Sequence, residues 1–325
     1  MIPIPGDTHN LLLTFLVTCA LQLSCFFVAY LLAFDKITDL AGSANFILLA
    51  LLSLFLSPTG APPSPRAIAI TTIVCVARLE LACYLLYRVL KRGKDARFDA
   101  IRESFWAFLV FWVFQILWVW GVSLPVVFVN SDAASAPPWG ASDSAGVALF
   151  AFGFLLQVVA DAQKDAFRGN PANSAKWCAV GVWAWSRHPN FFGEICLWWG
   201  VWVLSSAQLL GAAAWAWPVT LVSPLLTMLI LLAGSGIPSA EGDNQKRWMR
   251  TPEQAAAFAA YRSRTSPLIP LPPACFAATP RAVKRWALCE FKMYEVTEDR
   301  AGTVVVTGET AALSSQAFLG GKRAT

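Results

Sequence analysis

Long apolar stretches, separated by short polar ones, dominate the pattern of residues along this chain. A helix that crosses a bilayer needs ~20 mostly apolar residues, within a range of ~17–25. Seven stretches reach or approach that length, and the second is the shortest. They cover residues 11–34, 44–56, 67–89, 105–129, 145–160, 191–210 and 218–233. The pattern therefore predicts an all-α, polytopic membrane protein with about seven transmembrane helices.

Two shorter segments carry local signals. Residues 177–185 are apolar but too short to span, which favours a re-entrant or interfacial piece. Thr251 is followed by Pro252 and, three residues after Thr251, by Gln254. This is the pattern of a capping box with proline at the first helical position, so a helix is expected from Pro252 to about Arg264.

Domain organisation follows from where the apolar pattern ends. Residues 1–273 are expected to form one membrane domain, because the last proline-rich turn closes at 273. Residues 274–325 have a mixed character, with Gly, Ser and Thr dominating the end and a short candidate strand at 304–306. They are expected to form a peripheral or disordered tail.

Composition supports a bilayer as the solvent. Only 14% of the 325 residues are charged and 57% are hydrophobic, whereas a soluble globular domain carries about 25% charged residues. The net charge of +5 is small and lies in particular loops, so it argues for a topology and against nucleic-acid binding. The eight cysteines have no framework or ligand spacing, so neither disulfides nor a metal site is expected.

Loop charges orient the predicted bundle. Basic residues gather between the third and fourth segments (88–102), between the fifth and sixth (164–187) and after the seventh (246–264). The loop 130–144 has acidic residues and no basic one. Because basic loops stay in the cytosol, seven spans place the N-terminus in the lumen and the C-terminus in the cytosol. Such a protein is expected in the endoplasmic reticulum.

The most specific motif lies at the start of the sixth predicted span. It reads Ser186-Arg187-His188-Pro189-Asn190-Phe191-Phe192-Gly193-Glu194. Asn190 and Glu194, four residues apart, share one helix face, and polar groups in a span usually face the bundle interior, which favours a ligand site. Arg187 and His188 are placed to meet phosphates. The alternative is an interfacial anchor with Glu194 paired to a neighbouring helix. Gly193 indicates close approach by a ligand or by another helix.

A charged stripe at the cytosolic end of the fifth span is a second candidate. Asp161, Lys164, Asp165 and Arg168 follow the i, i+3, i+4, i+7 spacing of one helix face. The stripe is either part of a ligand site or a solvated helix end with exposed ion pairs, each of which contributes little to stability.

The third predicted span holds the remaining candidate, with Arg78 and Glu80 at its middle. Glu80, Tyr84 and Arg88 lie on one face, and a carboxyl group or a phenol in an apolar bundle is suited to donate a proton. The alternative is a buried structural network. Lys94 lies in the basic turn that follows, which is suited to hold an anion and also has the composition of any cytosolic loop.

Several common site motifs are missing. The sequence contains no dinucleotide fingerprint after a strand, no P-loop, no zinc-protease helix and no nucleophile elbow. Its two histidines, His9 and His188, argue against a histidine-rich di-iron desaturase or hydroxylase. Any nucleotide must therefore be held by the helical bundle itself.

The motif at 186–194, followed by Leu197-Trp198-Trp199-Gly200, resembles the C-terminal domain of the steroid 5α-reductase superfamily. It is most similar to the branch in which the motif reads S-R-H-P-N-[YF]-F-G-E. The resemblance covers roughly residues 11–273. It implies a seven-helix fold that holds NADPH in its C-terminal half, about 145–273, open to the cytosol. It also implies hydride transfer to an activated carbon–carbon double bond of a lipid such as a steroid, sterol or polyprenoid.

Residue roles follow from the resemblance. Asn190 and Glu194 match its nicotinamide-side contacts, Asp161 and Arg168 match contacts of the adenosine half, and Lys94 matches a phosphate contact. Tyr261 and Arg264 approximate its C-terminal Tyr and Arg. The full set of expected cofactor-binding residues is Lys94, Asp161, Lys164, Arg168, Arg187, His188, Asn190, Glu194, Tyr261 and Arg264.

The sequence departs from the superfamily pattern at the expected proton donor. Steroid-reducing members have a Tyr on the third helix where this chain has Glu80, and the His and Tyr after their seventh helix have no clear counterparts. The resulting hypothesis is a membrane reductase in which Glu80 or Tyr84 is catalytic and supplies the proton or holds the substrate oxygen.

Two rival interpretations remain open. Membrane methyltransferases that use S-adenosylmethionine share an R-H-P-x-Y-x-G element at the start of a late helix. The Asn and Glu of residues 190–194 and the total of seven spans favour the reductase. A non-catalytic membrane scaffold or sterol sensor is the third interpretation, and Glu80 in place of the Tyr is its best support.

Overall fold

The computed structural model describes residues 4–32, 37–92, 101–132, 136–174, 176–294, 296–298 and 304–306. The chain divides into two compact units. Unit 1 comprises Met1–Phe150 and Trp198–Leu226, and unit 2 comprises Ala151–Leu197 and Thr227–Thr325. Three long helices run from one unit into the other, so each unit is built from chain segments that are distant in sequence.

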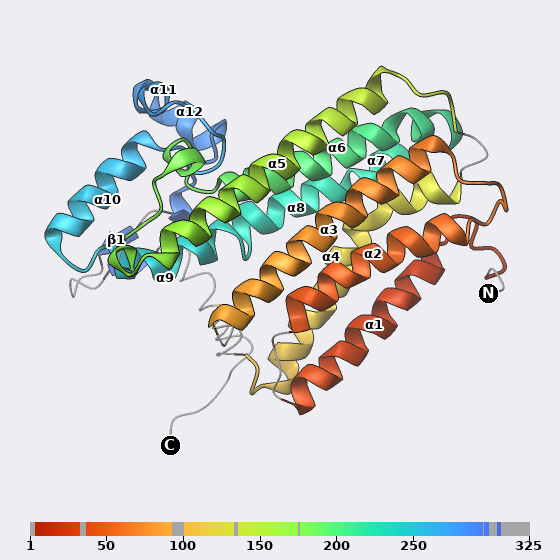
Figure 1. Cartoon of the computed structure of the whole chain (residues 1–325), viewed down its shortest axis with the longest axis horizontal. Helices are drawn as coiled ribbons and strands as arrows, with labels where there is room; N and C mark the ends of the chain where they lie inside the picture. The colour runs from red at the N-terminus through yellow and green to blue at the C-terminus, as the bar shows by residue number, and fades with distance from the viewer. Residues whose placement is uncertain are drawn as a thin grey trace. The chain divides into compact units, whose positions relative to one another are not determined.

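Unit 1 is a helical bundle whose first four helices lie side by side (Figure 1). Its elements are α1 (Leu11–Leu31), α2 (Thr38–Phe55), α3 (Pro65–Arg92), α4 (Phe105–Ser131), the start of α5 (Ala141–Gly169), the later part of α6 (Pro189–Ala212), α7 (Ala216–Thr220) and the start of α8 (Val222–Ala233). Among the described residues, seven helical segments are long and apolar enough to cross a membrane. The prediction of an all-α, seven-span membrane protein is confirmed. Its orientation and its compartment stay predictions.

The second span is longer than its apolar run suggested, because α2 begins at Thr38 and not near residue 44. Its extra turns include the buried polar residues Thr38 and Ser43, and polar groups of the helix are hydrogen-bonded to neighbouring helices. Gln22 on α1 donates to Asn45 Oδ1 at 3.0 Å, and Gln115 on α4 donates both to Gln22 Oε1 at 3.0 Å and to the Thr38 carbonyl at 3.1 Å. In a bilayer such bonds replace those that water would make. Hydropathy alone therefore underestimates the length of this helix.

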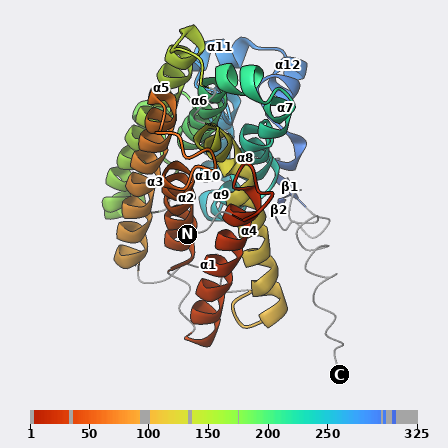
Figure 2. The same cartoon turned by 90° about the vertical axis from the view of Figure 1, so that its right-hand side faces the viewer.

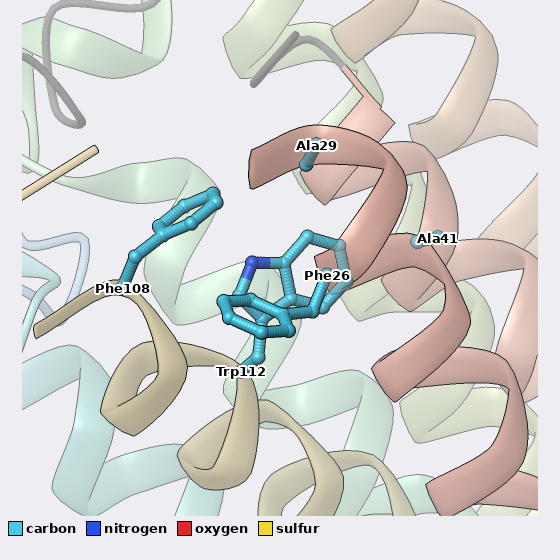
Figure 3. Close-up of a cluster of buried hydrophobic side chains, with 5 residues drawn as sticks. All are labelled: Phe26, Ala29, Ala41, Phe108 and Trp112. Carbon is cyan, nitrogen blue, oxygen red and sulfur yellow. The ribbon is translucent and has the colours of Figure 1, made fainter. Parts of the chain in front are cut away.

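An aromatic cluster lies in the core of unit 1, against the same three helices. Phe26 of α1 lies against Phe108 of α4, with ring centroids 5.8 Å apart, and Phe108 in turn contacts Trp112 edge-on at 6.0 Å. Ala29 and Ala41 close the cluster from α1 and α2, as Figure 3 shows. Small residues opposite large rings let α1 and α2 approach each other closely.

A buried ion pair joins α3 to the start of α5. Arg66 Nε lies 2.5 Å from Asp143 Oδ1, and its Nη2 lies 2.9 Å from Oδ2. The same guanidinium donates to the carbonyls of Pro137 and Pro138. A bidentate pair whose guanidinium also donates to two carbonyls avoids the cost of an isolated buried charge, so it ties the loop 136–140 to the bundle.

Glycines let α5 and α6 pack closely at two levels. In unit 1 a Cβ atom at Gly200 would lie 2.8 Å from the Gly146 carbonyl oxygen, and in unit 2 a Cβ at Gly193 would lie 2.5 Å from the Gly153 carbonyl oxygen. The two glycines on each helix are seven residues apart, two helical turns, so they face the same neighbour. The close approach expected at Gly193 is therefore made by another helix.

Unit 2 contains the later part of α5, the start of α6 and the later part of α8, followed by short helices. These are η4 (Pro171–Asn173), η5 (Gly181–Ala184), α9 (Ile237–Trp248), α10 (Pro252–Arg264), α11 (Pro273–Ala278), α12 (Arg281–Trp286) and η6 (Lys292–Tyr294). Strands β1 (Val296–Glu298) and β2 (Val304–Val306) pair antiparallel, with Val296 opposite Val306. Figure 2 shows the same elements from a second direction.

Two local signals in unit 2, the helix after Thr251 and the strand at 304–306, are confirmed, and the re-entrant or interfacial position of residues 177–185 stays a prediction. The helix predicted from Pro252 to Arg264 is α10, and Thr251 Oγ1 accepts a hydrogen bond from the Gln254 amide at 3.3 Å. The segment 177–185 does not span and contains only the turn η5. The expected strand at 304–306 is β2.

The packed chain continues beyond residue 273, where the membrane domain was expected to end. Phe276 and Tyr294 are each 1% exposed, and the Tyr294 hydroxyl donates to the Leu232 carbonyl at the end of α8. The first part of the expected tail is therefore folded into unit 2, while residues 307–325 lie outside the described residues. For that remainder, a peripheral or disordered tail stays a prediction.

Candidate functional site

The residues just before α6 are fixed by a strand-like contact with the segment after α10. Ser186 Oγ donates to the Leu268 carbonyl at 2.6 Å and accepts from the His188 amide at 3.1 Å. The Arg187 amide donates to the Ser266 carbonyl at 2.8 Å. Pro189 then begins α6, where its missing N–H costs nothing. The Ser-Arg-His-Pro motif therefore has a rigid backbone that sets the direction of its side chains.

Asn190 and Asp161, both expected in the site, are in direct contact. Asn190 on α6 donates from Nδ2 to Asp161 Oδ1 on α5, with 3.0 Å between the two atoms. Because an ionised carboxylate only accepts hydrogen bonds, this contact fixes the amide, with Nδ2 toward Asp161 and Oδ1 turned away. Asn190 Oδ1 is buried and has no hydrogen-bond partner among the described residues.

Gln157 adds a second acceptor of the same kind, which sequence reasoning missed. It lies one turn before Asp161 on α5, is 6% exposed, and packs where Gly193 brings α6 closest. Its Oε1 is also buried and lacks a partner within the described part of the chain. Its i, i+4 spacing from Asp161 was the available signal, since that spacing puts both on one helix face. Buried amide oxygens left unpaired are costly, which makes them candidates for ligand contact.

Arg187 is buried between two carboxylates. Its Nη2 donates to both oxygens of Glu290, at 2.8 and 3.0 Å, and its Nε lies 3.1 Å from Glu241 Oε1. Glu290 also pairs with Arg262 at 3.0 Å. Burial on its own lowers the pKa of Arg187, but the two carboxylates outweigh it and raise that pKa above its ordinary value. The guanidinium expected to meet a phosphate is therefore already neutralised by the protein.

His188 is a neutral, oriented imidazole. Its Nε2 lies 3.0 Å from Glu241 Oε1, and its ring stacks on Phe191 with centroids 5.2 Å apart. Burial lowers the pKa of His188, with Lys164 and Arg187 acting in the same direction and Glu241 opposing them. The neutral ring donates from Nε2 to the carboxylate, which leaves Nδ1 as a buried acceptor with no partner among the residues described.

Trp183 contacts two further residues that were expected in the site, Lys164 and Tyr261. Its indole donates to the Ala160 carbonyl at 2.8 Å, and Lys164 Nζ lies 4.3 Å from the centre of its ring. The Tyr261 hydroxyl donates to the Trp183 carbonyl at 2.8 Å. Burial raises the pKa of Tyr261 well above its ordinary value, so the hydroxyl stays protonated and acts as a donor. Lys164 and Tyr261 therefore both lie around the segment that precedes the motif.

The remaining expected residues lie at more exposed positions or outside the described residues. Arg168 and Arg264 are exposed, and the Arg264 Nε bonds to its own helix at the Ala260 carbonyl. Glu194 is half-buried on α6. Lys94 lies outside the described residues.

The two expected proton donors belong to α3 in unit 1. Glu80 and Tyr84 are both half-buried there, and the Arg88 guanidinium lies 5.9 Å from the Tyr84 ring centre. The fully buried polar residue at the middle of α3 is Arg78, which is 1% exposed and lies 5.3 Å from the ring of Trp198. Two residues along a helix correspond to about 200° of rotation, so Glu80 and Arg78 face different neighbours.

Across the described residues, no group of three or more His, Cys, Asp or Glu side chains is placed to hold a metal ion.

These features define a polytopic helical membrane protein with a buried polar cluster where its sixth span begins. A comparison with known families shows which family the chain belongs to. The family model described as "Protein of unknown function (DUF1295)" matches residues 25–265, and the chain belongs to this family. No curated protein and no solved structure matches the chain.

Proposed function

We propose that the protein is an NADPH-dependent membrane oxidoreductase of the steroid 5α-reductase superfamily. Its substrate class is a lipid with an activated carbon–carbon double bond, such as a steroid, sterol or polyprenoid-like compound. The protein acts in the endoplasmic reticulum, with the motif end of its helices and its C-terminus facing the cytosol. The observation that carries the proposal is the oriented amide of Asn190, held by Asp161 with its oxygen unpaired.

The unpaired atoms of the cluster fit a carboxamide ligand. A nicotinamide carries an NH2 group that must be received by acceptors, and Asn190 Oδ1 and Gln157 Oε1 are two buried acceptors that lack partners in the described structure. A ligand hydroxyl could donate to only one of the two acceptors, and a carboxylate could donate to neither. The residues present therefore fit NADPH, which when bound supplies a hydride.

The remaining residues have supporting roles in this proposal. Asp161 orients the Asn190 amide, and Lys164, within reach of the Trp183 ring, adds a positive charge beside the cluster. Glu80 or Tyr84 on α3 would donate a proton to the substrate or hold its oxygen. A positioned donor of this kind typically contributes 10²–10⁴-fold to a rate.

NADPH binding to the purified, full-length protein in detergent tests the proposal. The wild type should bind NADPH, and Asn190→Ala should lose that binding while eluting as a monodisperse protein. Asn244→Ala is the matched control, because Asn244 on α9 makes a local bond to the Ala240 carbonyl and should keep wild-type affinity.

Three outcomes contradict the proposal. Unchanged affinity in Asn190→Ala removes the role of that amide. Binding of S-adenosylmethionine without NADPH favours a membrane methyltransferase, which is the function of other proteins with an Arg-His-Pro element. Binding of neither ligand leaves a non-catalytic membrane scaffold.

A further inference from the structure

The helix pair α11–α12 exposes an apolar and basic surface. The six residues of α12 read Arg-Ala-Val-Lys-Arg-Trp, with three basic residues and no acidic one. Trp286 is 86% exposed and Val283, one turn earlier on the same face, is 44% exposed. Large exposed apolar side chains in a basic setting usually mark a contact surface.

The exposure of this surface is not a consequence of loose packing. Phe276 of α11 is buried, and Lys284 Nζ lies 4.5 Å from the centre of its ring while donating to the Ala277 carbonyl at 3.3 Å. The Glu290 amide donates to the Lys284 carbonyl at 2.9 Å. Figures 1 and 2 show α11 beside α12 in both directions of view. The pair is thus a fixed element that presents Trp286 outward.

Both ends of the pair are tied to the residues where α6 begins. Before α11, the Leu271 amide donates to the Trp185 carbonyl at 3.1 Å. After α12, Glu290 binds the guanidinium of Arg187. Trp185 and Arg187 stand immediately before Pro189, the first residue of a membrane-spanning helix. The pair is therefore held beside the first turn of a helix that is long and apolar enough to cross a membrane.

We propose that α11–α12 is a docking surface for anionic lipid headgroups of the surrounding membrane. Tryptophan side chains favour the boundary between headgroups and acyl chains, and basic residues at the cytosolic surface are attracted to anionic lipids. Arg281 and Trp286 supply these two interactions from one short helix. A bilayer is favoured over a protein partner because the neighbouring helix is long and apolar enough to cross one. This inference does not depend on the proposed catalytic activity.

Hydrogen exchange of the full-length protein in nanodiscs tests the inference. The amides of residues 281–287 should exchange more slowly in phosphatidylcholine with added phosphatidylserine than in phosphatidylcholine alone. The double variant Arg281→Glu, Trp286→Ser should lose this lipid-dependent slowing. Arg250→Glu, a charge change at another exposed position of unit 2, should retain it. Unchanged exchange at Tyr294 in the double variant shows that the packed segment next to the pair is intact.

Two results would overturn the inference. The first is equal protection of residues 281–287 with and without anionic lipid. The second is protection that appears in detergent and rises with protein concentration, which assigns the surface to a second copy of the chain.

Discussion

The Glu290 carboxylate binds two guanidinium groups, because it accepts hydrogen bonds from Arg187 at 2.8 Å and from Arg262 at 3.0 Å. Arg187 belongs to the motif before α6, and Glu290 follows it by 103 residues. Glu290 also lies beyond residues 25–265, which match the family model. The C-terminal segment therefore completes a cluster that begins within the family domain.

Removing this carboxylate should destabilise the protein. Breaking a buried ion pair by deleting one partner costs about 3–5 kcal/mol, and Glu290→Ala should fall near the lower figure because Glu241 still faces Arg187. Glu290→Gln should cost less, since its amide oxygen still accepts a hydrogen bond. Thermal unfolding in detergent, followed by tryptophan fluorescence, measures both. Glu103→Ala, at an exposed position, is the charge-matched control, and an equal effect there would argue against a stabilising role for the ion pairs of Glu290.

Sequence reasoning succeeded where the physical cause is local. The start of α6 at Pro189 and the cap at Thr251 follow from single residues and their spacing, and each stands where it was expected. The extent of α2 did not follow, because its first turns carry the polar residues Thr38, Asp39 and Ser43, and the partner of the Thr38 carbonyl is Gln115 on another helix. No local pattern could indicate that Glu290 would meet Arg187.

In the candidate site, too, some residues could be predicted from local sequence patterns and others could not. Asn190 and Asp161 were expected together, and the structure joins them. Gln157 was missed because its one sequence signal, the i, i+4 spacing from Asp161, does not show the crossing with Gly193 on which its role depends. Which face of α3 is buried was equally hidden, since the choice between Arg78 and Glu80 is made by packing.

The crossing of α5 and α6 should be intolerant of a methyl group at Gly193. A Cβ there would lie 2.5 Å from the Gly153 carbonyl oxygen, and overpacking of this kind costs typically ~1–3 kcal/mol. Alanine favours a helix by about 1 kcal/mol over glycine, which opposes the clash only in part. Gly211→Ala on the same helix isolates that gain, because nothing lies within 4 Å of its added Cβ. Gly193→Ala should therefore lower the unfolding temperature and Gly211→Ala should not. Equal stability of the two variants would mean that the helices are not closely packed.

The hydrogen bond from Asn190 to Asp161 should set the affinity for NADPH. In Asp161→Asn the facing group can donate as well as accept, so the Asn190 amide is no longer held in one orientation. A hydrogen bond to a charged group contributes about 1.5–3 kcal/mol, and on that scale the Kd for NADPH should rise roughly 10-fold or more. Equilibrium titration with NADPH measures the change, and the unfolding temperature serves as the control. A loss of stability with no loss of affinity would assign the pair to structure alone.

Stability should depend on pH through His188. Burial lowers the pKa of this imidazole in the folded protein, with Glu241 opposing the shift, while the unfolded chain titrates near ~6.5. The unfolded state therefore binds the proton more readily, and the stabilising contribution is complete above about pH 6.5 and is lost as the pH falls below it. His188→Gln keeps a donor toward Glu241 but does not titrate, so its unfolding temperature should fall less steeply between pH 7 and pH 5. The wild type and the variant, unfolded across that range in the same detergent, give the comparison. Parallel slopes would show that His188 takes up its proton equally in both states, and that the imidazole before α6 is not held neutral by burial.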